Sequence, residues 1–244
     1  MPSLPLSGKS ALVTGGARRL GRAIALALAE AGADITLTYL TSAEDAAKTV
    51  ASIEKLGRKA QAVRCDVRDE EQVCATVANA AAFHGRLDVV VNNSAIFERG
   101  QLATMTVAQW DAIFATNTRG PFLVAREALP HLRSSGGRII NIGSLGGVRP
   151  WADHAHYCAS KAALHMLTKT MAKAFAPEVR VNCVAPGWIA MEDSDTDAAV
   201  HFAAKTPLHR NGTAVDVTQA VVYFATNNGF VTGQILAVDG GLGL

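Results

Sequence analysis

Three residues of this chain have the types and spacing needed for acid–base chemistry on a carbonyl group. Tyr157 and Lys161 are four residues apart in a segment predicted to be helical, Ala155 to Phe175, so their side chains share one face. Ser144 follows an apolar strand. A phenol has an ordinary pKa of about 10 and a nearby ammonium favours its ionised form, so we expect Lys161 to lower the pKa of Tyr157. Together the three groups predict a site that protonates an alkoxide as a hydride arrives at carbon.

The composition limits the classes of protein to consider. With 244 residues, of which 49% are hydrophobic and 18% charged, the chain is long enough for one sizeable core. Its formal net charge of +2 gives no reason to expect nucleic acid or a membrane as a partner. The chain begins without the basic and then apolar order of a signal peptide, and we expect a cytoplasmic protein. The cysteines lack C-x-x-C spacing and are expected to be free thiols, at Cys65, Cys74, Cys158 and Cys183.

Apolar strands and amphipathic helices alternate along the whole chain. The predicted strands are Ser10–Thr14, Asp34–Tyr39, Lys59–Cys65, Leu87–Val91, Arg138–Gly143, Arg180–Ala185 and Ile235–Val238. The predicted helices are Leu20–Ala31, one capped by Ser42, Glu70–Phe83, a long one from Thr106 to Leu132, Ala155–Phe175, a short one within 191–205, and one opened by Thr213 with Asp216. This order predicts an α/β protein with a parallel sheet covered on both faces, in one domain spanning residues 1–244.

A glycine-rich turn joins the first strand to the first helix. It reads Thr14-Gly-Gly-Ala-Arg-Arg-Leu-Gly21. Glycines at such a turn let the backbone approach a pyrophosphate at the helix N-terminus. The turn does not match the strict G-x-G-x-x-G pattern. We interpret it as a pyrophosphate-binding turn because it joins the first strand to the first helix of an alternating chain.

The chain resembles the short-chain dehydrogenase/reductase family over essentially its whole length. The motifs that carry the resemblance occur in family order: Thr14–Gly21, Asp66 in Cys-Asp-Val, Asn92-Asn-Ser-Ala95, Asn117 in Ala-Thr-Asn-Thr, the set Ser144, Tyr157 and Lys161, Pro186-Gly-Trp-Ile189, Thr232-Gly-Gln, and Val238-Asp-Gly-Gly. The spacing of 13 residues from Ser144 to Tyr157 is usual for the family.

The resemblance implies a Rossmann-type, doubly wound fold with three α/β/α layers and hydride transfer with a nicotinamide cofactor. Tyr157 is then the general acid in reduction, Lys161 holds the nicotinamide ribose, Ser144 orients the substrate carbonyl, and Asn117 holds a water for proton relay. The implied cofactor-binding residues are Gly15, Arg18, Arg19, Leu20, Gly21, Tyr39, Thr41, Ser42, Asp66, Val67, Asn93, Ala95, Tyr157, Lys161, Pro186, Gly187 and Ile189.

The residues near the second strand favour NADP(H) over NAD. In this fold an acidic residue at the end of that strand selects NAD, whereas this chain has Tyr39 there. Arg18 and Arg19 lie on the neighbouring turn and suit the oxygens of a 2′-phosphate, with Thr41 and Ser42 as further donors.

The substrate stays open at this point. Arg19, in place of the second glycine of the family turn, resembles pteridine reductases, while the overall pattern resembles 3-oxoacyl-carrier-protein reductases. The substrate is therefore a 3-oxoacyl thioester, a pteridine (with reduction at C=N) or a small ketone, and residues 188–210 are expected to form the substrate loop. Whether an acyl-carrier protein is a partner is open. The alternatives are an NAD-dependent alcohol dehydrogenase and a non-catalytic, cofactor-sensing protein on the same fold.

Two further expectations concern metals and assembly. His154 and His156 flank Tyr157, but two histidines have too few companions for a metal site, so none is expected. Family members usually pair through two long helices, here Gln109–Leu132 and Ala155–Phe175, which predicts a homotetramer.

Overall fold

The computed structural model describes residues 4–191 and 195–244. In chain order its elements are β1 (Ser10–Val13), α1 (Arg19–Glu30), β2 (Asp34–Tyr39), α2 (Ala43–Lys55), β3 (Ala60–Arg64), α3 (Glu70–His84), β4 (Val89–Asn92), α4 (Val107–Phe114), the π-helical turn η1 (Ala115–Arg119), α5 (Gly120–Ser135), β5 (Arg138–Ile142), the 3-10 turn η2 (Leu145–Gly147), α6 (Ala155–Ala174), β6 (Arg180–Pro186), α7 (Thr196–Lys205), α8 (Ala214–Thr226) and β7 (Ile235–Val238).

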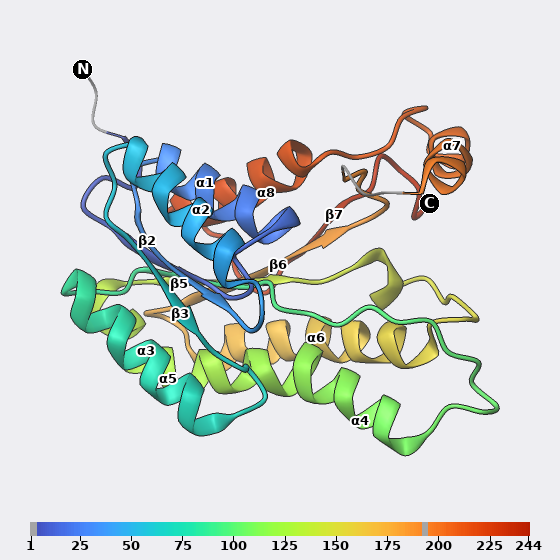
Figure 1. Cartoon of the computed structure of the whole chain (residues 1–244), viewed down its shortest axis with the longest axis horizontal. Helices are drawn as coiled ribbons and strands as arrows, with labels where there is room; N and C mark the ends of the chain where they lie inside the picture. The colour runs from blue at the N-terminus through green and yellow to red at the C-terminus, as the bar shows by residue number, and fades with distance from the viewer. Residues whose placement is uncertain (1–3, 192–194) are drawn as a thin grey trace.

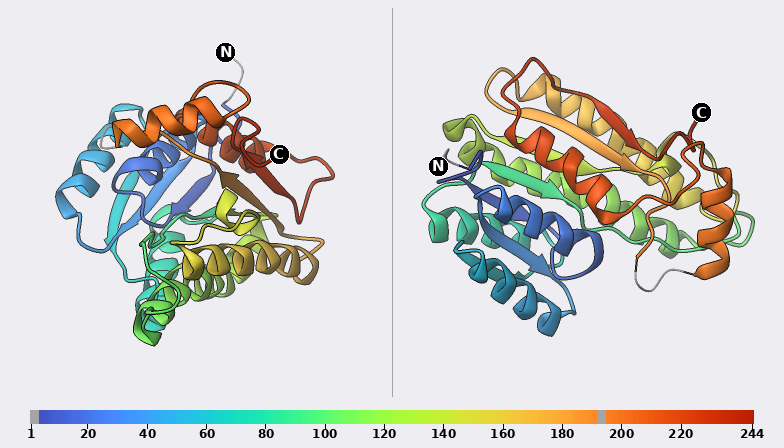
Figure 2. Two further views of the ribbon diagram at one scale, coloured as in Figure 1. Left: turned by 90° about the vertical axis from the view of Figure 1, so that its right-hand side faces the viewer. Right: turned by 90° about the horizontal axis from the view of Figure 1, so that it is seen from above.

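Within those two ranges, seven strands form one parallel sheet in the order β3-β2-β1-β4-β5-β6-β7. Helices α1, α2 and α8 cover one face, and α3, α5 and α6 cover the other (Figures 1 and 2). The predicted Rossmann-type, three-layer arrangement is therefore confirmed. No helix in the described ranges is long and apolar enough to cross a membrane.

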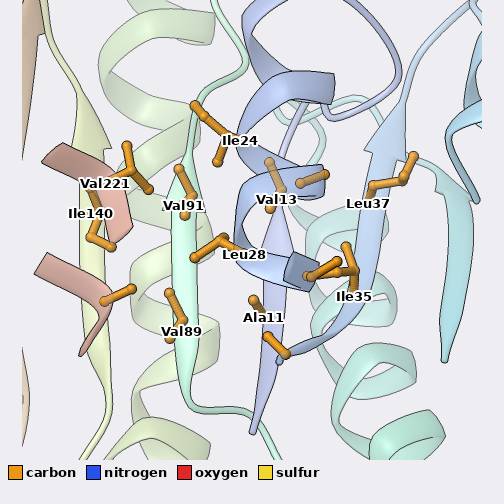
Figure 3. Packing of buried hydrophobic residues seen from close by; sticks show 14 of the residues in the cluster. Ala11, Val13, Ile24, Leu28, Ile35, Leu37, Val89, Val91, Ile140 and Val221 are labelled. Carbon is orange, nitrogen blue, oxygen red and sulfur yellow. The ribbon is translucent and has the colours of Figure 1, made fainter. Parts of the chain in front are cut away.

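The core consists of aliphatic side chains on both faces of the central strands. Between the sheet and helices α1 and α8, Ile24 and Leu28 of α1 pack against residues of β1, β2 and β4, and Val221 of α8 packs beside Ile140 of β5 (Figure 3). Strands buried on both faces explain why their sequences are continuous apolar runs. The predicted strands match the observed ones to within two residues at each end.

The strand order reverses direction between β1 and β4, and this point defines the crevice where such sheets bind ligands. The backbone amides of Asn93 and Ser94, just after β4, donate to the Thr14 hydroxyl just after β1, at 2.9 and 3.0 Å. The glycine-rich turn and the segment after β4 are thus joined at the carboxyl edge of the sheet.

A buried polar chain sets the position of α6 against the sheet. Asn92 Nδ2 on β4 donates to Asn141 Oδ1 on β5 at 2.8 Å, and Asn141 Nδ2 donates to Thr168 Oγ1 on α6 at 2.9 Å. Asn141 and Thr168 are fully buried, so each bond is made away from water. These two hydrogen bonds hold α6, the helix that carries Tyr157, over the ends of β4 and β5.

The predicted long helix from Thr106 to Leu132 is interrupted, and the expectation of one continuous α-helix was wrong. Residues 115–119 form the π-helical turn η1 between α4 and α5. Pro121 explains the widening, because it has no N–H to donate to the carbonyl of Asn117 four residues earlier, and its ring crowds that carbonyl. Single π turns of this kind are frequent at functional sites, and Asn117 lies in this one.

Two of the three predicted helix caps are confirmed. Thr106 with Gln109 and Thr213 with Asp216 form complete capping boxes at the starts of α4 and α8. Ser42 stands at the N-cap position of α2, but its side chain makes no capping hydrogen bond, so that expectation was wrong. The short helix expected within 191–205 is α7.

The amino edge of the sheet depends on the carboxylate of Asp88. It accepts hydrogen bonds from the Ser10 amide at 3.0 Å and from Arg86 at 2.6 Å, and it pairs with Lys9 at 3.1 Å. Burial alone would raise the pKa of Asp88, but the hydrogen bonds from Arg86, the Ser10 amide and Lys9 hold that pKa below its ordinary value of 3.8.

We predict that Asp88→Ala lowers the free energy of unfolding by about 1–3 kcal/mol, because the buried Ser10 amide loses its acceptor. Chemical denaturation at pH 7 measures this loss. Because the pKa of Asp88 is lower in the folded chain, its contribution is complete above an unfolded pKa of about 3.9 and is lost as the pH falls through the folded value. Asp34→Ala, at the same edge but half-buried, is the matched control with a smaller loss. Equal stability of wild type and Asp88→Ala would contradict this role.

Candidate active site

The carboxyl end of β5 and the first turns of α6 bring Ser144, Tyr157 and Lys161 together. Ser144 immediately follows the β5–Gly143 segment and stands at the start of η2. Tyr157 and Lys161 lie on one face of α6, which packs against η2 and β6. All three are buried, with exposed fractions of 5%, 9% and 3% in that order. The arrangement places a hydroxyl, a phenol and an ammonium in one small volume.

Two aromatic side chains from separate loops cover Tyr157. The ring of Phe97, from the segment after β4, meets the ring of Tyr157 edge-on with centroids 4.8 Å apart. Trp151, from the segment before α6, stacks on Tyr157 at 6.1 Å. His154 stacks in turn on Phe97 at 4.5 Å. These rings remove water from the phenol and give the site an apolar, aromatic wall.

The lowered pKa expected for Tyr157 is not found in this structure. Burial raises the pKa of Tyr157 to about 12, although hydrogen bonding to Ser144 acts in the opposite direction. Lys161 does not offset the burial, because its Nζ lies 5.8 Å from the centroid of the Tyr157 ring. The phenol is therefore protonated at neutral pH.

The ammonium of Lys161 is directed at the sheet. Its Nζ donates to the carbonyl of Ile142, the last residue of β5, at 2.7 Å. Burial lowers the pKa of Lys161 to about 8, and the nearby Cys183 raises it slightly in return. Lys161 is therefore close to its titration midpoint at mildly alkaline pH, unlike an exposed lysine.

The side chain of Asn117 joins the segment after β4 to α6 by hydrogen bonds. Its Nδ2 donates to the Ile96 carbonyl at 2.9 Å and to Ser160 Oγ at 3.1 Å, and its Oδ1 accepts from the Ile96 amide at 2.8 Å. The residue is fully buried, and both amide hydrogens are used. The two side-chain amide hydrogens therefore fix the Phe97-bearing segment against α6, and the water expected from the resemblance stays a prediction.

A cavity of about 470 Å³ lies at the crevice between β1 and β4, within the size range of small-molecule sites. It is lined by many of the residues expected to bind the cofactor: Gly15, Arg18, Arg19, Leu20, Gly21, Tyr39, Thr41, Ser42, Asp66, Val67, Asn93 and Ala95. Sequence reasoning missed other lining residues, Ala17, Leu40, Cys65, Arg68, Ser94, Ile96 and Thr116.

The glycine-rich turn has the close contacts that a dinucleotide cradle needs. Gly15 has φ 63°, and a Cβ at Gly21 would lie 2.0 Å from the Gly15 carbonyl oxygen. Asn93 Nδ2 holds the turn by donating to the carbonyls of Thr14 and Gly15, at 2.9 and 3.1 Å. The residues present therefore fit a nicotinamide dinucleotide with its phosphates at the start of α1.

Arg19 adopts a backbone conformation that usually requires glycine. Its φ is 51°, in the left-handed region, where a side chain costs roughly 1–2 kcal/mol. This is the position at which the family turn has its second glycine, so the sequence retains a guanidinium here at the expense of backbone strain. Arg18 and Arg19 are both exposed at the wall of the cavity.

The carboxylate of Asp66, expected beside the adenine, is bound to Arg68. Arg68 donates to both carboxylate oxygens, at 2.6 to 3.0 Å. The side-chain hydrogen bond from Arg68 is the main reason that the pKa of Asp66 lies below its ordinary value. Arg68, directly after the Cys65-Asp-Val67 motif, thus contributes to the wall of the cavity as the partner of Asp66.

The remaining predicted cofactor residues lie outside that cavity. Tyr157 and Lys161 belong to the catalytic cluster, and Pro186, Gly187 and Ile189 belong to the segment after β6. The Gly187 amide donates to the Val238 carbonyl at 3.0 Å, and the Ala190 amide donates to the Gly212 carbonyl at 2.9 Å. These bonds fix the segment at the same edge of the sheet as the catalytic cluster.

The predicted substrate loop, residues 188–210, contains α7. Trp188 stacks on Phe202 of α7 with centroids 4.5 Å apart, which joins the start of the loop to α7. Residues 192–194 of the loop lie outside the described residues. In the described part of the chain, no three His, Cys, Asp or Glu side chains are grouped as metal ligands would be.

The sequence and the fold match known proteins over nearly the full chain. The family model described as enoyl-(acyl carrier protein) reductase matches residues 15–243. Trihydroxynaphthalene reductase of Colletotrichum orbiculare and tetrahydroxynaphthalene reductase of Pyricularia oryzae are each 36% identical, over 98% of this chain and 91% of theirs.

Solved structures show the same similarity. A dehydrogenase/reductase from Sinorhizobium meliloti is 39% identical with a TM-score of 0.93, covering 98% of this chain and 97% of that one. A blue fluorescent protein from a metagenomic library, in complex with NADPH, is 36% identical with a TM-score of 0.91, covering 98% and 99%.

We predict that Tyr157→Phe lowers kcat by at least about 10²–10⁴-fold while the cofactor dissociation constant changes little, because only the proton donor is removed. Steady-state kinetics and cofactor fluorescence titration measure the two effects. Lys161→Ala is expected to lower kcat and also to weaken cofactor binding. Tyr223→Phe, on the half-exposed face of α8, is the matched control and should behave as wild type. Substantial turnover by Tyr157→Phe would assign the acid to another residue.

Proposed function

This chain belongs to the short-chain dehydrogenase/reductase family, and on that premise we propose that it is an NADPH-dependent reductase of carbonyl groups in small ring-bearing substrates. The observation that carries the proposal is the buried Ser144–Tyr157–Lys161 cluster at the same carboxyl edge of the sheet as a cavity whose wall carries Arg18 and Arg19. When bound, the nicotinamide cofactor supplies the hydride.

The protonation state of Tyr157 is the one that reduction of a carbonyl group requires. A phenol with a pKa of about 12 is protonated at neutral pH, which is the form that donates a proton to an alkoxide oxygen. Oxidation of an alcohol needs the phenolate, which burial disfavours here.

Each catalytic residue has a role that its contacts allow. The Ser144 hydroxyl accepts a hydrogen bond from the Gly146 amide at 3.0 Å and acts to lower the pKa of Tyr157, so its own hydrogen is available for the substrate oxygen. Tyr157 gives its proton to that oxygen. The Lys161 ammonium holds the end of β5 through the Ile142 carbonyl and thereby places Tyr157, one turn earlier on α6, at the site. Asn117 and its π-helical turn keep the Phe97 segment in place over the phenol.

The aromatic wall supports a planar substrate. Phe97 and Trp151 border the Tyr157 ring, and flat rings stack well on such side chains. The relatives named for trihydroxynaphthalene and tetrahydroxynaphthalene act, by those names, on flat aromatic compounds. A cyclic aromatic ketone is therefore the substrate class that we place first, ahead of a 3-oxoacyl thioester or a pteridine. Turnover of the three classes with NADPH distinguishes them, and no turnover of any of them would refute the proposed function.

The proposed preference for NADPH rests on charge at the wall of the cavity. Among the described residues that line it, Tyr39 ends β2 and is followed by Thr41 and Ser42 with no carboxylate between them, and Arg18 and Arg19 line the same cavity. A charge-assisted contact between a guanidinium and a phosphate contributes roughly 1.5–3 kcal/mol, which corresponds to about a tenfold to hundredfold preference.

We predict that kcat/KM with NADPH exceeds that with NADH by about tenfold to hundredfold, and that Arg18→Ala or Arg19→Ala reduces this ratio. Arg22→Ala is the matched control, because Arg22 lies one turn further along α1 and donates to Ser52. Equal efficiency with both cofactors in wild type would refute the preference. If the ratio of the two kcat/KM values is unchanged in both alanine variants, Thr41 and Ser42 are the residues that recognise the 2′-phosphate.

We also propose that the chain forms a homotetramer in the cytoplasm. The outer faces of α4, α5 and α6 expose apolar side chains, among them Trp110, Phe122 and Met166 at 37%, 41% and 61%. Neighbouring exposed apolar groups of this size are typical of surfaces that are covered in an assembly.

Phe122→Glu is expected to split the assembly, because it introduces a charge into the proposed interface. Light scattering at micromolar concentration should show a tetramer for wild type and smaller species for Phe122→Glu. Leu56→Glu, at 42% exposure on the end of α2 in the other helix layer, controls for added charge and should remain tetrameric. A monomeric wild type would contradict the proposal.

A further inference from the structure

We propose that His165 is a positioning residue: its neutral imidazole fixes the backbone turn that carries Ser144, and so sets the place of the Ser144 hydroxyl relative to Tyr157. This inference rests on the proposed reductase function. His165 follows Lys161 by one helical turn, as Lys161 follows Tyr157, so the three residues form one stripe on α6. The four-residue spacing of this stripe is already present in the sequence, from which a role is expected for Tyr157 and Lys161 but not for His165.

The imidazole contacts the turn through a hydrogen bond. The Ser144 amide donates to His165 Nε2 at 3.4 Å, and His165 is only 6% exposed. One turn earlier, Lys161 donates to the carbonyl of Ile142. Two consecutive turns of α6 therefore hold the backbone on either side of Gly143. Lys161 holds the end of β5, and His165 holds the serine itself.

The turn is shaped to fit the imidazole ring. A Cβ at Gly143 would lie 2.3 Å from His165 Nε2, and a Cβ at Gly147 would lie 2.5 Å from His165 Cε1. Contacts this short exclude a side chain at either glycine without displacement of the ring. The segment that carries Ser144 thus lies directly on His165 at both ends, and a change of the ring changes the support of the whole turn.

The surroundings keep the imidazole in the neutral form that can accept a hydrogen bond. Burial lowers the pKa of His165 to about 4, and Lys161 and Lys169 on the same helix act in the same direction. From β6 the group that faces this region is Cys183, whose pKa burial raises to about 12, so the thiol is neutral. No carboxylate among the described residues contributes to the pKa of His165. Because Nε2 accepts from the Ser144 amide, the ring proton resides on Nδ1.

The first test compares two substitutions of different chemistry. In His165→Leu the Ser144 amide loses its acceptor, and we expect kcat to fall about tenfold to a hundredfold while the dissociation constant of NADPH changes less than about threefold. In His165→Gln the side-chain carbonyl can accept the same bond, and kcat should return to within about threefold of wild type. His84→Leu, which removes a half-buried imidazole with one side-chain hydrogen bond to Thr36, is the control on α3 and should keep wild-type kcat.

A merely structural role would give a different result. Both His165 variants would then lose thermal stability alike and retain wild-type kcat below the unfolding transition, and this outcome would overturn the proposal. The proposal would also be overturned if His165→Leu and His165→Gln were both impaired. The loss of kcat would then not be caused by the loss of the hydrogen bond that His165 accepts.

A second measurement does not depend on turnover, so it separates this inference from the proposed function. Hydrogen exchange of the Ser144 amide, followed by NMR, should be slow in wild type and His165→Gln and at least about tenfold faster in His165→Leu. Equal protection in all three would overturn the positioning role even in an active enzyme. A wild type that reduces no carbonyl substrate, with exchange as expected, would refute only the proposed function.

Discussion

The hydrogen bond from the buried Lys161 ammonium to the carbonyl of Ile142 is the contact on which the geometry of the site depends. A cation with an exposed fraction of 3% must be satisfied by the protein, and here a backbone carbonyl at the end of β5 does so. The bond fixes α6 against the carboxyl edge of the sheet. Tyr157 and His165, one turn before and after Lys161, are thereby placed over Ser144, and the Asn92–Asn141–Thr168 chain supports the same placement from below.

Burial, more than charge, sets the protonation states at this edge. Phe97 and Trp151 remove water from Tyr157 and raise its pKa, while the same exclusion of water lowers the pKa values of Lys161 and His165. The result is a phenol that holds its proton and an imidazole that can only accept a hydrogen bond through Nε2. The site is therefore arranged to give a proton to a developing alkoxide in a low-dielectric environment.

The sequence predicted the fold and the location of the site because both depend on local regularities. Apolar runs separated by amphipathic helices specify a parallel sheet, and four-residue spacing specifies which side chains share a face of α6. The direction of the Tyr157 pKa was not predictable, because it depends on Phe97 and Trp151, which reach the phenol from loops distant in the chain. The bonds of Asn117 to the Ile96 backbone and of Asp66 to Arg68 are likewise tertiary contacts. The π-helical turn had a local signal in Pro121, which cannot donate to the carbonyl four residues earlier.

The central claim is that the sheet edge buries Lys161, which lowers the pKa of its ammonium and fixes α6 over Ser144. The most direct test is an NMR titration of the ¹³Cε resonance of Lys161 in the folded protein, assigned by its loss in Lys161→Met. The account predicts a midpoint near pH 8, below the ordinary lysine pKa of 10.5. A midpoint at the ordinary value would show that the ammonium is solvated, and it would contradict the claim that its bond to the Ile142 carbonyl organises the site.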